Sequence, residues 1–193
     1  MNTETKTDPY PAEWAQLPRV TDIVRFAYPD AFAGIPERDK AYYFERGSAN
    51  HLLWSMMADG TADAYDFDPE VQKYRPGYEK FLKDTGFKPL PGGIECRVKN
   101  EELGYKGTYD LLGTVGNRVW LIDLKTTKAE PKPTALQTAL YLLALPGYKF
   151  SEVERYGIGI RNDGKYAMTP RFPDSDENDA IYWAQKFKEN RHD

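Results

Sequence analysis

Residues 107–127 read GTYDLLGTVGNRVWLIDLKTT, two runs of strand-forming residues joined by Gly116-Asn117. A Gly-Asn dipeptide between two strand-like runs is typical of a two-residue β-hairpin turn. Counting back from that turn along both runs places Asp110 directly opposite Asp123. Residues paired in this way have Cβ atoms about 4.5–5.5 Å apart, where two like charges destabilise a sheet. The stretch therefore predicts two carboxylates that need a cation between them, and Mg²⁺ or Mn²⁺ is suited to such oxygen ligands.

Alternation along the second run places Lys125 on the same face as Asp123. The opposite face of that run is apolar and carries Trp120, Ile122 and Leu124. An ammonium beside a carboxylate-bound metal can orient or help deprotonate a water and stabilise charge on a phosphate, which is metal-assisted hydrolysis. These residues alone leave a second interpretation open, a solvated sheet face with an ordinary ion pair.

The rest of the chain surrounds this hairpin with further elements. Helical spacing, caps and breakers predict helices over 21–28, 37–57, 69–83, 134–145 and 176–189. Strand-like runs cover 94–99, 105–115, 118–126, 154–160 and 165–170. This order predicts an α/β (α+β) fold with a central mixed β-sheet flanked by helices. Without a repeat or linker, we expect an extended lead-in over 1–20 and one domain over 21–193.

Composition narrows the class of protein. The 193 residues include 4 Trp, 14 Tyr and 9 Phe, too many large apolar side chains for a disordered chain. The net charge of -4 counts against a polybasic nucleic-acid binder. The single cysteine, Cys96, excludes an internal disulfide and an iron-sulfur cluster. The sequence has no phosphate-binding loop motif, so we expect no nucleotide cofactor. With neither a long apolar run nor a signal segment, we expect a cytoplasmic protein with no membrane contact.

The hairpin residues resemble the PD-(D/E)XK nuclease superfamily, in particular its RecB-like and phage exonuclease branch. Residues 107–110 resemble the strand motif with the first metal-binding Asp, and residues 122–127 resemble the Asp-x-Lys strand with its following threonine. Tyr109 stands where the family's name-giving proline would be, at a position known to be loose. The resemblance spans roughly residues 21–145.

Three outer motifs follow the family's order. Residues 46–51 resemble the helical segment whose histidine is an additional metal ligand, and Glu95 matches an acidic residue of the first core strand. Gln137 and Tyr141, four apart on one helical face, resemble the Gln-x-x-x-Tyr signature of the RecB-like branch. Each residue also fits a plain structural role, as a satisfied helix histidine, a water-facing strand glutamate or part of a helix stripe.

The resemblance implies a restriction-endonuclease-like core and a set of site residues. One or two Mg²⁺ or Mn²⁺ ions would be held by His51, Asp110, Asp123, Glu95 and the backbone carbonyl of Leu124. Lys125, Asp110 and Asp123 would be catalytic, with Lys125 helping to activate the attacking water. Substrate contacts would come from Gln137, Tyr141, Thr126 and Arg46.

The implied function is that of a divalent-metal-dependent DNA nuclease, an exonuclease of phage or prokaryotic DNA recombination and repair. It would act on single- or double-stranded DNA in a bacterial or phage-infected cell, with a recombination protein or helicase as partner. Two alternatives remain at this point, a cleavage-inactive nucleic-acid or protein binding module of the same fold and a structure-specific endonuclease. Five basic residues are candidate phosphate contacts or ordinary surface charges, namely Arg97, Lys99, Lys106, Lys128 and Lys132.

Overall fold

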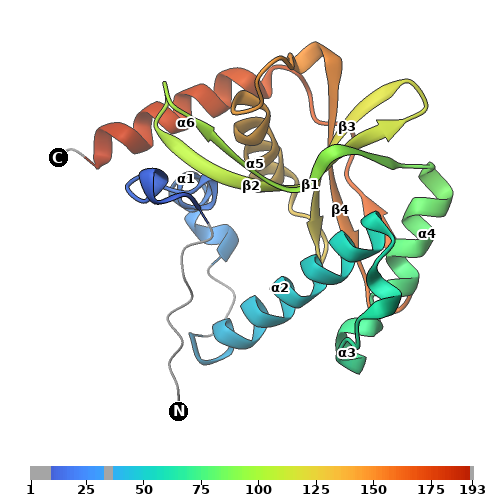
Figure 1. Cartoon of the computed structure of the whole chain (residues 1–193). Helices are drawn as coiled ribbons and strands as arrows, with labels where there is room; N and C mark the ends of the chain where they lie inside the picture. Colours follow the sequence, from blue (N-terminus) through green and yellow to red (C-terminus); the bar gives the residue numbers. More distant parts are fainter. Residues whose placement is uncertain (1–9, 33–36, 192–193) are drawn as a thin grey trace.

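The computed structural model describes residues 10–32 and 37–191, and side chains over residues 10–31 and 45–191. Its centre is a five-stranded sheet in the order β1-β2-β3-β4-β5 with helices on both faces (Figure 1). A central sheet flanked by helices confirms the predicted fold class. The strands are β1 (Lys88–Asn100), β2 (Tyr105–Val115), β3 (Arg118–Lys125), β4 (Val153–Ile160) and β5 (Tyr166–Met168). The helices are α1 (Val20–Ala27), α2 (Glu37–Asp59), α3 (Pro69–Gln72), α4 (Arg75–Thr85), α5 (Pro131–Leu143) and α6 (Asp176–Asn190).

The hairpin between β2 and β3 has the predicted register. Val115 pairs with Arg118 and Leu111 with Ile122 across the two-residue turn. Gly116 has a φ of 59°, the left-handed conformation that a tight hairpin turn requires and that glycine adopts at little cost. The turn therefore fixes which face each side chain of β3 occupies.

The sheet is mixed because α5 separates β3 from β4. β3 and β4 pair in parallel, whereas the β1–β2, β2–β3 and β4–β5 pairs are antiparallel. Parallel neighbours need a crossover connection, which is why a helix lies between them in the sequence. The predicted hairpin of β4 and β5 is confirmed.

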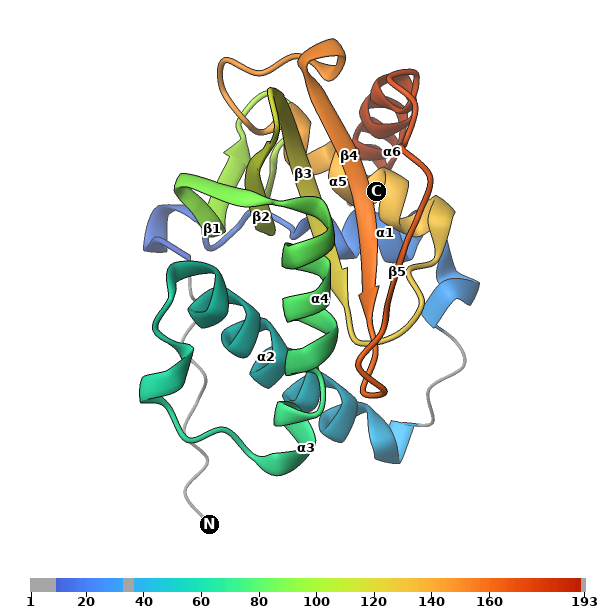
Figure 2. The same ribbon diagram turned by 90° about the vertical axis from the view of Figure 1, so that its right-hand side faces the viewer.

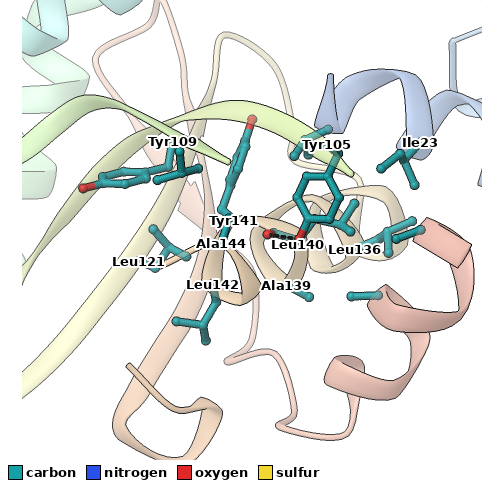
Figure 3. Close-up of a cluster of buried hydrophobic side chains, with 14 of the residues drawn as sticks. Ile23, Tyr105, Tyr109, Leu121, Leu136, Ala139, Leu140, Tyr141, Leu142 and Ala144 are labelled. Carbon is teal, nitrogen blue, oxygen red and sulfur yellow. Dashed lines mark hydrogen bonds between the residues drawn. The ribbon is translucent and has the colours of Figure 1, made fainter. Parts of the chain in front are cut away.

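Two apolar clusters fill the space between the sheet and the helices. Figure 2 shows α4 on one face of the sheet and α5 on the other. The α5-side cluster joins the sheet to α1, α5 and α6, and Figure 3 shows Tyr105 within it, donating a hydrogen bond of 2.7 Å to the Leu140 carbonyl. The α2-side cluster joins the other face to α2, α3 and α4 and includes Trp54, Tyr78 and Phe81. Within the described residues, none of the helices has the length and apolarity needed to cross a membrane.

Two predicted elements have different bounds. The helix expected over 69–83 is divided into α3 and α4, because Pro76 lacks an N–H for the Gln72 carbonyl and its ring would clash there. The strand expected to start at residue 94 starts at Lys88 and shifts register between Pro89 and Ile94. The prolines and glycines at its start are typical of a loop, which is why the sequence did not predict a strand there. Because β1 is an edge strand, proline is tolerated in it.

The described part of the lead-in, residues 10–19, is partly folded and packs against β2. Ala12–Trp14 forms a 3₁₀ turn, and the amide of Lys106 donates to the Pro18 carbonyl at 2.9 Å. Arg19 forms a parallel bridge with Lys106, and α1 begins at Val20. Residues 1–9 of the expected lead-in lie outside the described residues.

Candidate active site

The site begins where β2 and β3 separate. Their backbone pairing ends at Leu111 and Ile122. Beyond this pair, the Leu124 N–H donates to the Asp110 carboxylate, at 2.5 Å to Oδ2, instead of to a strand carbonyl. Because the N–H and C=O of one strand residue point to the same neighbouring strand, the Leu124 carbonyl also faces β2. The two strands thus form a fork that presents a carboxylate and a backbone carbonyl.

A backbone irregularity in β1 lies beside this fork. Glu95 has a φ of 47°, in the left-handed region that side chains other than glycine rarely adopt. Ile94 and Cys96 flank it, paired with Leu111 and Tyr109, and they pack on opposite faces of the sheet although they are two residues apart. Such a conformation costs about 1–3 kcal/mol and is concentrated at functional sites. It places the Glu95 carboxylate next to α2.

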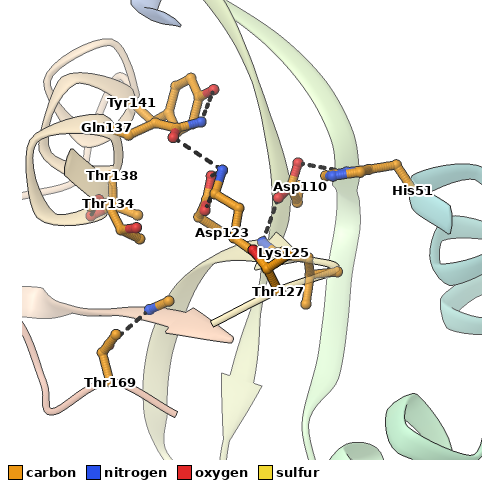
Figure 4. Close-up of polar contacts among 12 residues, drawn as sticks. His51, Asp110, Asp123, Lys125, Thr127, Thr134, Gln137, Thr138, Tyr141 and Thr169 are labelled. Atoms are coloured by element: carbon orange, nitrogen blue, oxygen red, sulfur yellow. Dashed lines mark hydrogen bonds and ion pairs between the residues drawn. The ribbon is translucent and has the colours of Figure 1, made fainter. Parts of the chain in front are cut away.

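His51 of α2 reaches both acids (Figure 4). Its Nδ1 lies 3.2 Å from Glu95 Oε1 and 3.1 Å from Asp110 Oδ1. One ligand atom from each of the three side chains lies within 4.8 Å of the others. An imidazole nitrogen and two carboxylates at this separation are a donor set that suits a divalent cation.

Electrostatics in this cluster favour a positive charge between the acids. Burial opposes charge on His51, but the carboxylates of Asp110 and Glu95 outweigh it and raise the pKa of the imidazole to about 10. Burial raises the pKa of Glu95. Burial also opposes ionisation of Asp110, yet His51, Lys125 and the Leu124 amide lower its pKa. The two carboxylates therefore stabilise a proton on His51.

A second chain of contacts runs from β3 to α5. Lys125 Nζ lies 2.8 Å from Asp123 Oδ2 and donates to Asp123 Oδ1 at 3.1 Å and to Gln137 Oε1 at 3.2 Å. The Gln137 amide donates to the Tyr141 hydroxyl at 3.0 Å. Figure 4 shows these side chains on the opposite side of Asp110 from His51. The Gln-x-x-x-Tyr pair on α5 thus holds the lysine amine in place.

The pKa directions of this pair follow from burial and from the neighbouring charges. Burial and the nearby Asp110 carboxylate raise the pKa of Asp123 to about 6, although Lys125 opposes the shift. Burial disfavours the ammonium of Lys125, but Asp123 and Asp110 outweigh burial and raise its pKa. Lys125 is therefore an ammonium at neutral pH. A cation with a third of its surface exposed next to buried carboxylates can contact an incoming phosphate.

Among the described residues the structure groups His51, Glu95 and Asp110, whereas Asp123 faces Lys125. From the hairpin alone, the sequence argument placed a cation between Asp110 and Asp123, with Lys125 on the same face and an ordinary ion pair as the alternative. The contact of His51 with Glu95 spans 44 residues, which no local pattern predicts.

The remaining expected residues lie around this centre. Thr126 directly follows Lys125 and is half-buried, and Arg46 lies on α2, five residues before His51. Of the basic candidates, Lys106 is 2% exposed, so it is not a surface contact. Arg97, Lys128 and Lys132 are exposed, and Lys99 is half-buried.

Two glycines of β4 are structural requirements that the sequence argument missed. Gly157 pairs with Asp123 and Gly159 with Lys125. A Cβ atom at Gly157 would lie 2.7 Å from Thr134 Cγ2, and one at Gly159 would lie 2.4 Å from the Thr127 carbonyl oxygen. The absent side chains let α5 and the loop before it close over β4. A Gly-x-Gly pair inside a strand is the signal that could have indicated this close approach.

The chain is similar to a known protein family over more than half of its length. The family model described as PD-(D/E)XK nuclease superfamily matches residues 37–188. Among solved structures, the chain is similar to a protein titled "Putative exonuclease" from Eubacterium rectale, at 9% identity and a TM-score of 0.46. That match covers 73% of this chain and 65% of the other, so the chain spans less than two thirds of its length. No curated protein matches the chain.

Proposed function

The chain belongs to the PD-(D/E)XK nuclease superfamily, and from this premise we propose that it is a divalent-metal-dependent DNA nuclease that hydrolyses phosphodiester bonds. The observation that carries the proposal is the junction at Asp110, which contacts His51 on one side and the Leu124 amide beside Lys125 on the other. We further propose an exonuclease of the RecB-like type, active in phage or prokaryotic DNA recombination or repair. A helicase or recombination protein that supplies unwound DNA belongs to the same proposal.

The donors of the fork fit a Mg²⁺ or Mn²⁺ ion. His51, Glu95 and Asp110 would hold it, with Asp123 and the Leu124 carbonyl as the neighbouring oxygen donors. The imidazole favours manganese somewhat over a site made only of oxygens. When bound, the ion supplies Lewis-acid stabilisation of the phosphate and an activated water.

Lys125 would act on the phosphate and on the attacking water. Its ammonium is held between Asp123 and Gln137, so its direction is set before substrate arrives. Preorganised donors of this kind stabilise the charge that develops on phosphate oxygens and do not need to reorient during the reaction. Gln137 and Tyr141 would serve by orienting Lys125, and Thr126 and Arg46 would contact the DNA backbone.

The first test is cleavage of end-labelled single- and double-stranded DNA with Mg²⁺ or Mn²⁺. Because general acid–base and electrostatic groups contribute about 10²-fold or more, Asp123→Ala and Lys125→Ala should each lower the rate at least about 100-fold. Arg118→Gln is the matched control, since Arg118 is exposed at the far end of β3. Circular dichroism of each variant checks that it folds.

Two outcomes would redirect the proposal. If no metal supports cleavage of any DNA by the wild-type protein while DNA still binds, the chain is a binding module of the same fold. If circular DNA without ends is cut as fast as linear DNA, the enzyme is an endonuclease, since an exonuclease requires a free end.

A further inference from the structure

Next to the candidate metal ligands Glu95 and Asp110, strands β1 and β2 carry basic side chains. Arg97 pairs with Thr108, and Lys99 pairs with Lys106, two and four residues from Glu95 along β1. Residues two apart share a face of a strand, and Val98 between them is buried in the α5-side cluster. At about 3.3 Å per residue, Lys99 lies about 13 Å along the strand from Glu95. A row of cations therefore leads away from the candidate active site.

The lead-in places two aromatic rings along this row. The Tyr10 hydroxyl is hydrogen-bonded to Thr108 Oγ1 at 3.0 Å, and the centroids of the Tyr10 and Trp14 rings are 6.2 Å apart. Figures 1 and 2 show the lead-in, in dark blue, running beside β1 and β2. The rings come from a segment some 80 residues before β1, so tertiary structure alone brings them here.

Cations contact both rings. Lys106 Nζ lies 4.6 Å and Arg19 Cζ 5.7 Å from the Tyr10 centroid, and Lys99 Nζ lies 5.3 Å from the Trp14 centroid. We name this surface the cation–aromatic patch, and it comprises Tyr10, Trp14, Arg19, Arg97, Lys99 and Lys106. Among the described residues, carboxylates lie at its margin: Glu101 Oε1 is 2.5 Å from Lys99 Nζ, and Asp22 Oδ2 accepts a hydrogen bond from the Arg19 amide at 2.9 Å.

The patch is open to solvent at its outer members. Arg19 and Arg97 are exposed, Tyr10 and Trp14 are half-buried, and the Lys99 side chain is 33% exposed. Lys106 is buried beneath Tyr10 and adds positive charge from below. The surface therefore offers ring atoms and cations together, on and beside the strands that carry Glu95 and Asp110.

This combination matches the chemistry of single-stranded nucleic acid. Sequence-tolerant binding of a single strand has two components. Cationic side chains contact the phosphate backbone, and aromatic side chains stack on the bases. In a duplex the bases already stack on one another, so a ring such as Trp14 gains little from it. We propose that the cation–aromatic patch binds the single-stranded DNA segment leading to the candidate active site, with phosphates at Arg97 and Lys99 and a base on Trp14. This inference rests on the proposed nuclease function and names the form of its substrate.

The test is the binding of a fluorescein-labelled oligo-dT to the full chain, followed by anisotropy in EDTA, so that no turnover is involved. Since stacking of one base contributes a factor of about five or more, Trp14→Ala should weaken binding at least about fivefold, and Trp14→Phe should restore most of it. Each phosphate contact on a single strand contributes about 0.7 to the slope of log affinity against log salt. Arg97→Gln with Lys99→Gln should therefore make the slope shallower by about 1.4. Arg118→Gln, an exposed arginine at the other end of the sheet, should change neither quantity.

The proposal would be overturned if the patch variants bound oligo-dT with the same affinity and the same salt slope as the wild-type protein. Equal losses for duplex DNA would overturn the assignment to single strands, and a preference for oligo-U over oligo-dT would reassign the patch to RNA. Cleavage assays separate this inference from the proposed function. If the patch variants bind DNA more weakly but the wild-type protein cleaves no DNA, the nuclease function is refuted and the patch proposal stands. If the wild-type protein cleaves DNA but the patch variants bind it as well as wild type, the patch proposal is refuted.

Discussion

At the level of single residues, the site holds more negative than positive charge. Among the described residues, Glu95, Asp110 and Asp123 are three carboxylates, and they form ion pairs with two cations, His51 and Lys125. With all five groups ionised, the cluster carries one uncompensated negative charge. Burial and the neighbouring Asp110 carboxylate raise the pKa of Asp123 to about 6, whereas burial lowers the pKa of His51 and the carboxylates of Asp110 and Glu95 outweigh it and raise that pKa to about 10.

The raised pKa of His51 predicts that metal binding releases a proton. A metal ligand must be neutral imidazole, so below pH 10 the proton has to leave before the nitrogen can bind. From pH 7 to 9 the neutral fraction rises about tenfold per pH unit, and the apparent Mn²⁺ affinity should rise with it. Calorimetry in two buffers of different ionisation enthalpy measures the proton directly.

The control for this measurement is His51→Asn, which has no proton to lose. It should bind Mn²⁺ more weakly and show nearly the same binding heat in both buffers. Equal heats for the wild-type protein in the two buffers would contradict the coupling of metal uptake to His51.

At the level of elements, the position of α5 on β2 decides where Gln137 and Tyr141 lie. A Cβ atom at Gly107 would be 2.6 Å from Tyr141 Cε1 and 2.9 Å from Val20 Cγ2. The glycine thus allows the Tyr141 ring and α1 to approach β2 closely. The hydroxyl of Tyr141 accepts the hydrogen bond that orients Gln137 toward Lys125.

Gly107→Ala should therefore destabilise the fold and lower activity. Overpacking of this kind costs about 1–3 kcal/mol, and in a chain of this size each kcal/mol lowers the unfolding midpoint by about 2–4 °C. Gly47→Ala is the control, because Gly47 is in α2 with nothing within 4 Å of an added Cβ atom. That change should stabilise by about 0.5–1 kcal/mol. Thermal unfolding distinguishes the two, and a gain in stability for Gly107→Ala would refute the close contact.

At the level of the whole molecule, Arg155 of β4 connects the sheet to the helices that cover it. This residue is 1% exposed and donates to the Ala135 carbonyl at 2.9 Å and to Thr138 Oγ1 at 3.2 Å, both on α5. It also donates to the Pro173 carbonyl at 2.7 Å and to Asp176 Oδ2 of α6 at 2.8 Å. One guanidinium therefore sets the position of α5, which carries Gln137.

Arg155→Met should cost about 3–5 kcal/mol of folding free energy, because removal of one partner leaves a poorly solvated carboxylate. The matched control is Arg171→Met, which breaks an exposed ion pair with Asp174 and should cost about 0–1 kcal/mol. Denaturant unfolding measures both. Similar losses in the two variants would show that Arg155 does not connect these elements.

Local sequence patterns predicted most of the elements, the register of the β2–β3 hairpin and the residue types proposed for the site. Each depends on neighbours in the chain, because Gly116-Asn117 selects a two-residue turn and alternation then assigns Asp123 and Lys125 to one face. The family resemblance, and no local pattern, grouped His51 with Glu95 and Asp110, and packing brings their side chains together. Packing also places Tyr10 and Trp14 beside β1 and gives Glu95 its left-handed backbone, which no sequence pattern indicated. These contacts join residues far apart in the chain, so they depend on how whole faces pack together rather than on local turn geometry or capping.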